Sequence, residues 1–157
     1  MLKSLARLYA KQIAPIDGLI VLVVKHLQQK IYTELNSDKA TKERMIMSNC
    51  WNTIKTICEQ KEYINYRDQI EKELLPLFNY MEKPNDIDFD DEVIGIMTSF
   101  IELSGVITPV QWILLKTFPL VFEKYNSTLS SVFRCLNLMI VHGREYIMKE
   151  AWIIDLV

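Results

Sequence analysis

The spacing of apolar residues constrains the fold of this chain more than any other feature. In nearly every segment, apolar side chains recur at positions i, i+3, i+4 and i+7, which places them on one face of an α-helix. No window alternates apolar and polar residues as a half-buried strand does. Only 4 glycines and 5 prolines are spread over the 157 residues, whereas an all-β fold needs many tight turns. The sequence therefore predicts an all-α protein.

This periodicity, combined with capping and turn residues, predicts about eight helices. They are expected over residues 2–13, 18–35, 39–60, 64–81, 90–103, 109–125, 128–141 and 144–157. Thr108 and Pro109 are expected to start one helix, Gly105 to stop another, and His142 with Gly143 to end a third. Because 50% of the residues are hydrophobic, residues 1–157 are expected to bury a core as a single domain.

Two similar segments carry a proline where a helix is expected. ELLPLFNYMEK starts at Glu73 and KTFPLVFEKY starts at Lys116, so that Pro76 and Pro119 are 43 positions apart. That distance lies within the period of roughly 40–47 residues that HEAT and armadillo repeats show. A proline inside a helix costs about 3 kcal/mol. We therefore expect each proline to kink the second helix of a pair around a superhelix axis.

The same offset of 43 positions relates apolar residues in three of the other predicted helices. The aligned sets are Cys50, Val93 and Leu136; Thr53, Ile96 and Met139; Ile54, Met97 and Ile140; and Ile57, Phe100 and Gly143. The pattern predicts an α-α superhelix of about four HEAT-type helix pairs; the alternative is an irregular bundle with two unrelated prolines. The apolar first helix and the closing AWIIDLV lack the polar outer face of terminal repeats, so we expect a fragment of a longer solenoid.

The acidic segment NDIDFDDE, residues 85–92, raises the question of a calcium site. Asp86, Asp88 and Asp90 match the first alternating ligands of an EF-hand loop. The sixth position should be glycine but is Asp91, and the twelfth should be glutamate but is Met97. We therefore interpret the segment as a solvated loop and expect no metal site.

No catalytic or zinc-binding arrangement is visible in the sequence. His26 and His142, the latter near a predicted helix end, lack the spacing of zinc ligands. Glu71 and Glu73 could in principle act as an acid and a base, but are interpreted as charges on the solvated face of a helix. Ser127, Ser130 and Ser131 have no neighbouring base. The sequence therefore predicts a protein that is not an enzyme and has no cofactor or small-molecule substrate.

The remaining sequence features point to packing rather than to chemistry. The three cysteines, Cys50, Cys58 and Cys135, form no CxxC pair and are interpreted as reduced core thiols of an intracellular protein. The tryptophans could form a stacking platform for bases, but each lies in an apolar helical stripe, which favours core or inter-repeat packing. They are Trp51, Trp112 and Trp152.

Charge and hydropathy limit the kinds of partner. A net charge of -2 argues against nucleic acid as a partner. The apolar run over residues 19–24 is too short to span a bilayer, which argues against membrane insertion.

Residues 37–150 resemble the importin-β superfamily of nuclear transport receptors, the karyopherins, within the importin-seven/eight subgroup. The resemblance is carried by SDKATKERMIMSNCWNTIKTICEQKEYI, DFDDEVIGIMTSFIELSG and ITPVQWILLKTFPLVFEKY. In that subgroup a helix led by acidic residues precedes a second helix that opens with Ser/Thr-Pro. That second helix contains a tryptophan and a PLVFE-like segment. Thr108, Pro109, Trp112 and residues 119–123 follow this order.

The resemblance implies a HEAT-repeat segment of a receptor that carries protein cargo through nuclear pores. The implied partners of the full-length receptor are cargo, Ran GTPase and phenylalanine-glycine nucleoporins. The implied location is the cytoplasm and the nucleus, between which such receptors shuttle. No Ran-contact or nucleoporin-contact residue can be assigned in this segment. The competing hypotheses are a general HEAT scaffold outside transport, and an all-α enzyme or small-ligand binder.

Overall fold

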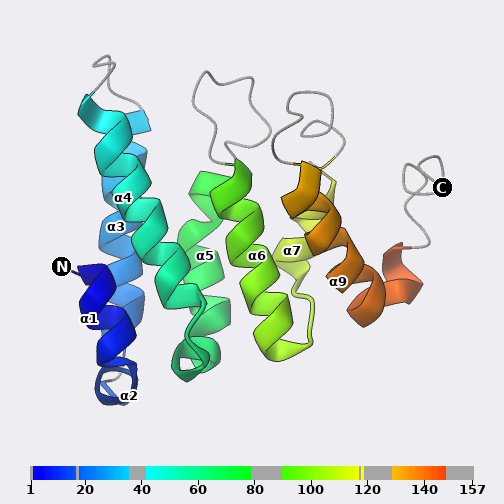
Figure 1. Cartoon of the computed structure of the whole chain (residues 1–157), viewed down its shortest axis with the longest axis horizontal. Coiled ribbons are helices and arrows are strands. Elements are labelled where there is room, and N and C mark those ends of the chain that lie inside the picture. Colours follow the sequence, from blue (N-terminus) through cyan, green and yellow to red (C-terminus); the bar gives the residue numbers. More distant parts are fainter. Residues whose placement is uncertain are drawn as a thin grey trace. The chain divides into compact units, whose positions relative to one another are not determined.

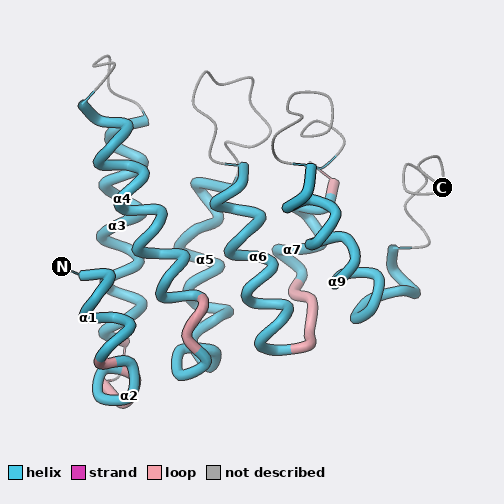
Figure 2. The backbone as a smooth tube through the Cα atoms, in the orientation of Figure 1, coloured by secondary structure: helices cyan, strands magenta, loops and turns pink. Residues whose placement is uncertain are grey.

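The structure is a computed structural model that describes residues 2–16, 18–35, 42–78, 90–116, 118 and 129–147. These residues form helices and connecting turns and contain no strand, which confirms the prediction of an all-α protein. The chain divides into two compact units, Met1–Asn79 (unit 1) and Tyr80–Val157 (unit 2). Figure 2 shows the described helices of each unit and the loops between them.

The described residues of unit 1 form five α-helices and a 3-10 helix. They are α1 (Leu2–Leu8), α2 (Ala10–Ile13), α3 (Leu19–Leu35), α4 (Lys42–Cys58), the 3-10 helix η1 (Lys61–Tyr66) and α5 (Arg67–Phe78). The helix α1 packs on α4, and α3 packs on both α4 and α5. As Figure 1 shows, α3 and α4 lie side by side and run in opposite directions. Apolar side chains between these helices form the core of the unit, including Ile31, Ile54, Ile57, Ile70 and Leu74.

The first helix differs from the prediction. Instead of one helix over residues 2–13, the chain turns at Tyr9 and forms α1 and α2. Two tyrosines of η1 bond to the backbone of this region. The Tyr63 hydroxyl donates to the Ala6 carbonyl at 3.1 Å, and the Tyr66 hydroxyl donates to the Ala14 carbonyl at 2.9 Å. Because these contacts join residues more than 50 positions apart in sequence, local helical spacing could not predict them.

The helix predicted over residues 64–81 is likewise divided, into η1 and α5. Pro76 lies inside α5 on an exposed face, whereas the neighbouring Leu74 and Leu77 are buried. Its ring nitrogen cannot donate the helical hydrogen bond to the carbonyl of Lys72, four residues earlier. Pro119, with which it was paired in sequence, lies outside the described residues, so the pair of kinks around a superhelix axis stays a prediction.

Replacing Pro76 with alanine is expected to raise the free energy of unfolding by roughly 2 kcal/mol. Removing an interior proline recovers up to about 3 kcal/mol, and the greater freedom of the unfolded chain takes back about 0.4–1 kcal/mol. Urea unfolding would measure the change. The control is Gln69→Ala at another exposed position of α5, with an expected change within about 0.5 kcal/mol. A destabilised Pro76→Ala protein would show instead that packing in unit 1 requires the proline geometry.

Unit 2 contains α6 (Asp90–Ser104), α7 (Pro109–Leu115) and α9 (Leu129–Ile147). The helix α6 packs on α9, and the two run in the same direction in Figure 1, with α7 running in the opposite direction. Gly105 ends α6 with a φ of +64°, a conformation that glycine adopts without steric penalty. Its amide donates to the carbonyl of Ile101 at 2.8 Å. The predicted stop of this helix at Gly105 is confirmed.

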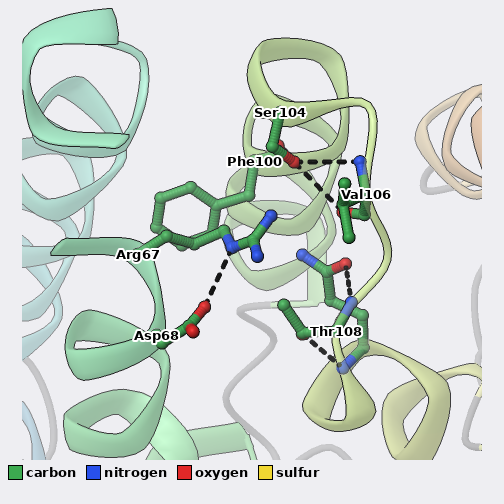
Figure 3. Close-up of polar contacts among 7 residues, drawn as sticks. Arg67, Asp68, Phe100, Ser104, Val106 and Thr108 are labelled. Atoms are coloured by element: carbon green, nitrogen blue, oxygen red, sulfur yellow. Dashed lines mark hydrogen bonds and ion pairs between the residues drawn. The ribbon is translucent and has the colours of Figure 1, made fainter. Parts of the chain in front are cut away.

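The predicted start at Thr108 is also confirmed, and the structure adds a reciprocal partner. The amide of Gln111 donates to Thr108 Oγ1 at 3.3 Å, and Gln111 Oε1 accepts from the amide of Thr108 at 3.0 Å. The short connection from α6 is bridged by Ser104, whose hydroxyl donates to the Phe100 carbonyl at 2.7 Å and accepts from the Val106 amide (Figure 3). Local hydrogen bonds therefore define the whole turn between α6 and α7.

Of two other predicted helix boundaries in unit 2, the structure corrects one and confirms one. The continuous helix over residues 109–125 is wrong, because α7 ends at Leu115. A proline four positions later cannot donate to the Leu115 carbonyl, which explains this end; residues 119–125 lie outside the described residues. The predicted break at Gly143 is confirmed: its φ of −146° and ψ of 33° are not helical, so that α9 consists of two helical segments joined by a kink at this residue.

Candidate protein-binding groove

A cavity of about 770 Å³ opens in unit 1 between α1, α3 and α4. Its lining consists of Lys3, Ser4, His26, Leu27, Lys30, Ile46, Asn49, Cys50, Asn52 and Thr53. A second cavity of about 380 Å³, lined by Lys3, Arg7, Thr56, Glu59 and Gln60, shares Lys3 with the first. We call the two together the basic groove.

The walls of the basic groove come from helix faces with regular spacing. Lys3 and Arg7 lie one turn apart on α1, and His26 and Lys30 lie one turn apart on α3. Residues four positions apart share one face of a helix. Each wall therefore presents two basic side chains from one face of its helix.

The third wall is α4, which contributes amide and hydroxyl groups. Asn49, Asn52 and Thr53 lie on one face of this helix. The Asn52 Nδ2 donates to Ser48 Oγ at 3.3 Å, and the Thr53 hydroxyl donates to the Asn49 carbonyl at 2.8 Å. The bottom of the groove is apolar, because Leu27 and Cys50 are both buried. The larger cavity therefore combines basic walls, amide groups and an apolar floor.

Two described acidic residues lie near the groove. Glu59 lines the smaller cavity, and Glu34 on α3 adds, after the larger effect of burial, to the raised pKa of the Cys50 thiol, which Lys30 lowers. None of the described residues that line the larger cavity is an aspartate or a glutamate. A protein with a net charge of -2 thus carries a locally positive cavity in its N-terminal unit.

The structure separates the residues that the sequence singled out for metal or catalytic chemistry. His26 lines the basic groove in unit 1, whereas His142 lies within α9 of unit 2. Asp86 and Asp88 lie outside the described residues, and Asp91 is an exposed residue of α6. Among the residues that the structure describes, no group of three or more His, Cys, Asp or Glu side chains could hold a metal ion.

The interpretation of Glu71 and Glu73 as a solvated face is wrong for Glu71. Glu73 Oε1 lies 3.8 Å from Lys25 Nζ at the surface, whereas Glu71 is only 2% exposed. Its position in α5 turns it toward the core, on the side of Ile70 and Leu74. Its charge raises the pKa of the Cys58 thiol, after the larger effect of burial. Helical spacing alone did not reveal this burial, because Glu71 falls at the edge of the apolar stripe.

The three cysteines are free thiols and all are buried, as the sequence predicted for core positions. Burial raises the pKa of Cys50 and of Cys58 above the ordinary value. Burial likewise raises the pKa of Cys135 from 9.0 to about 11, although a side-chain hydrogen bond with Thr98 partly offsets it. These thiols are protonated at neutral pH and are poor nucleophiles.

The raised pKa of Cys135 predicts a loss of stability in alkaline solution. Between pH 9 and about pH 11 the unfolded chain loses this proton while the folded chain keeps it. The stabilisation is therefore complete below pH 9 and declines by up to about 1.4 kcal/mol per pH unit as the pH rises. Urea unfolding across this range would measure the slope for the wild type and for Cys135→Ala. We expect a shallower slope for the variant; equal slopes would contradict the assignment.

The tryptophans do not form a common stacking platform within the described residues. Trp51 lies in the core of unit 1 and is 1% exposed, as the packing interpretation predicts. Trp112 lies on α7 in unit 2, where its ring borders Gly143. Trp152 lies outside the described residues. The two described tryptophans therefore serve the packing of separate units.

The basic groove itself was missed in the sequence. The available signal was the spacing of the basic residues. Lys3 and Arg7 lie one helical turn apart in the first predicted helix, and His26 and Lys30 lie one turn apart in the second. Nothing in the sequence indicated that these two faces meet across α4, since that depends on how α1 and α3 pack.

Among the described helices, none is long and apolar enough to cross a membrane. Comparison of the chain with models of protein families, with curated proteins and with solved structures gives no match. The functional conclusion therefore depends on the residues and geometry of this chain.

Proposed function

We propose that this chain is a protein-binding helical-repeat segment of a Ran-dependent, importin-β-like receptor that imports protein cargo through the nuclear pore. The proposal starts from the resemblance of residues 37–150 to karyopherins. It assigns no catalytic residue, no cofactor and no small-molecule substrate. The segment would supply binding surface, and the receptor would shuttle between cytoplasm and nucleus.

The observation that carries the repeat part of the proposal is a common pattern of burial at the offset of 43 positions. Thr53 of α4, Ile96 of α6 and Met139 of α9 are all buried. The aligned Cys50, Val93 and Leu136 are buried too. The pattern is incomplete, because Ile140 is 41% exposed where its counterparts Ile54 and Met97 are buried. Three helices that bury equivalent positions are typical of repeated structural units.

The packing order inside each unit supports the same proposal. In unit 1, α1 packs on α4, and α3 packs on α5. In unit 2, α6 packs on α9. Contacts in which a helix packs on one that lies further along the chain than its immediate successor are expected when antiparallel pairs stack in two layers. HEAT-type pairs have this arrangement, so we infer that each unit is built from them.

Transport would then depend on differential binding. In the receptors that this chain resembles, the nucleotide state of Ran controls cargo release. We infer that Ran binding shifts the curvature of the whole solenoid, and that cargo prefers one curvature. A bent two-layer array can respond in this way because each interface between pairs contributes a small rotation.

The alternative proposal is a general HEAT scaffold subunit that takes no part in transport. The two differ in their response to Ran. A pull-down on the full-length receptor should retain Ran loaded with a non-hydrolysable GTP analogue and release Ran loaded with GDP. Retention of neither form, or of both equally, would overturn the transport proposal and favour the scaffold. A fluorescent fusion concentrated at the nuclear rim would support transport independently.

A further inference from the structure

We propose that the basic groove of unit 1 binds an acidic segment of a partner protein that carries an apolar anchor side chain. This inference rests on the proposed protein-binding function and names the chemistry of the partner. It does not depend on whether that partner takes part in transport. The volume of the groove, the charges on its walls and its apolar floor each limit which ligands it can bind.

Three basic side chains on the walls form no ion pair within the described part of the chain. Lys3, Arg7 and Lys30 form no ion pair with another residue that the structure describes. By contrast, Lys25 on the same helix α3 lies 3.8 Å from Glu73. Basic side chains that converge on one cavity repel each other, and a bound carboxylate relieves this repulsion. Glu59 offsets part of the charge only at the smaller end.

The shape and the floor of the groove select a peptide among anionic ligands. The larger cavity, at about 770 Å³, has the size of a site that encloses a few side chains. Leu27, Ile46 and Cys50 provide an apolar surface for one anchor. The amides of Asn49 and Asn52 can donate to and accept from a peptide backbone.

A nucleic acid fits these observations less well. Its binding depends mainly on many phosphate contacts along an extended basic surface. Here Lys3, His26 and Lys30 border a cavity of about 770 Å³ with an apolar floor, and the whole chain has a net charge of -2. Nucleic acid binding is therefore kept as an outcome of the test.

The probe is a short fluorescein-labelled peptide in which aspartates and glutamates alternate with leucines, titrated with the 157-residue chain and followed by fluorescence anisotropy. One reference peptide replaces the acids with asparagine and glutamine, and another replaces the leucines with serine. We expect the acidic, leucine-bearing peptide to bind most tightly. Its affinity should fall with added salt because opposite charges are screened.

The decisive variant is Lys3→Glu/Lys30→Glu, which reverses two charges of the groove. We expect its affinity for the acidic peptide to fall by about tenfold or more, because like charges then face each other. The matched control is Lys61→Glu/Lys72→Glu, with the same change in net charge at exposed positions of η1 and α5. Its affinity should stay within about twofold. Circular dichroism checks folding, and Lys3→Met/Lys30→Met replaces the first variant if it does not fold.

Three results would overturn the proposal. The first is equal binding of the acidic and neutral peptides, and the second is equal loss in the groove variant and its control. The third is stronger displacement of the peptide by duplex DNA than by unlabelled peptide. The Ran pull-down tests the transport proposal separately. Peptide binding without discrimination between the two forms of Ran would support the groove proposal and reject the transport proposal. Discrimination between the two forms of Ran without peptide binding would support transport and reject the groove proposal.

Discussion

Replacing Trp51 with alanine is expected to lower the free energy of unfolding by about 3–5 kcal/mol, the largest effect of any substitution considered for this chain. The indole ring lies in the core of unit 1 and is 1% exposed. Its removal eliminates a large apolar contact surface and leaves a cavity that the neighbouring helices fill only partly. Urea unfolding followed by circular dichroism would measure the change.

The control for Trp51→Ala is Met45→Ala on the same helix, α4. The Met45 side chain is 70% exposed, so its truncation should change the free energy of unfolding by less than about 0.5 kcal/mol. The comparison also tests the base-stacking alternative. A tryptophan that binds bases at the surface could be removed with little loss of stability, so a small effect would reject its assignment to the core.

Replacing Gly143 with alanine is expected to destabilise unit 2 by about 1–3 kcal/mol through overpacking. A Cβ atom at this position would lie 2.7 Å from Cδ1 of Ile107 and 2.7 Å from Cη2 and Cζ2 of Trp112. Carbon atoms are in favourable contact at about 3.5–4.0 Å, so the new methyl group must displace both side chains. The isoleucine end can rotate, whereas the rigid indole ring must move as a whole.

A double-mutant cycle identifies the source of this cost. We expect Gly143→Ala to be less destabilising in a Trp112→Ala protein than in the wild type, because the ring that the methyl group meets is absent. A coupling energy of about 0.5–3 kcal/mol is typical of residues in contact. If the two substitutions are additive, the cost of Gly143→Ala comes from the backbone or from Ile107 and not from the indole ring.

These two substitutions also test the prediction that residues 1–157 form a single domain. Trp51 belongs to unit 1 and Gly143 to unit 2. If the chain unfolds as one cooperative domain, each variant should shift the same thermal transition. If each variant shifts a different transition, the units unfold separately, and the single-domain prediction is wrong.

The helices were predictable because their signals are local. Thr108 and Gly105 act through their own backbone and that of residues within one turn, so the start of α7 and the end of α6 were identified correctly. The break at Tyr9 was not, because the Tyr63 and Tyr66 hydroxyls that bond to this region come from η1. Contacts between residues far apart in sequence do not alter the spacing of apolar residues in either segment, so this spacing does not predict them.

Gly143 shows a position that the sequence identified correctly but whose physical reason it did not reveal. Glycine near the end of an apolar stripe commonly terminates a helix, so an end was predicted there. In the structure the helix breaks at Gly143 and a second helical segment follows, and the missing side chain makes room for Ile107 and Trp112. The residue type indicated a special position, but only the neighbouring segment shows that the requirement is space.

The sequence by itself determined that the chain is helical, where the turn between α6 and α7 lies, and that its cysteines are core residues. Each of these follows from hydrophobic periodicity and from hydrogen bonds within one helical turn. Tertiary structure alone decided that Glu71 is buried and that the basic faces of α1 and α3 meet beside the amides of α4. Helical spacing predicts which residues share a face of one helix. Packing against other helices decides which faces come into contact and which side chains form a common site.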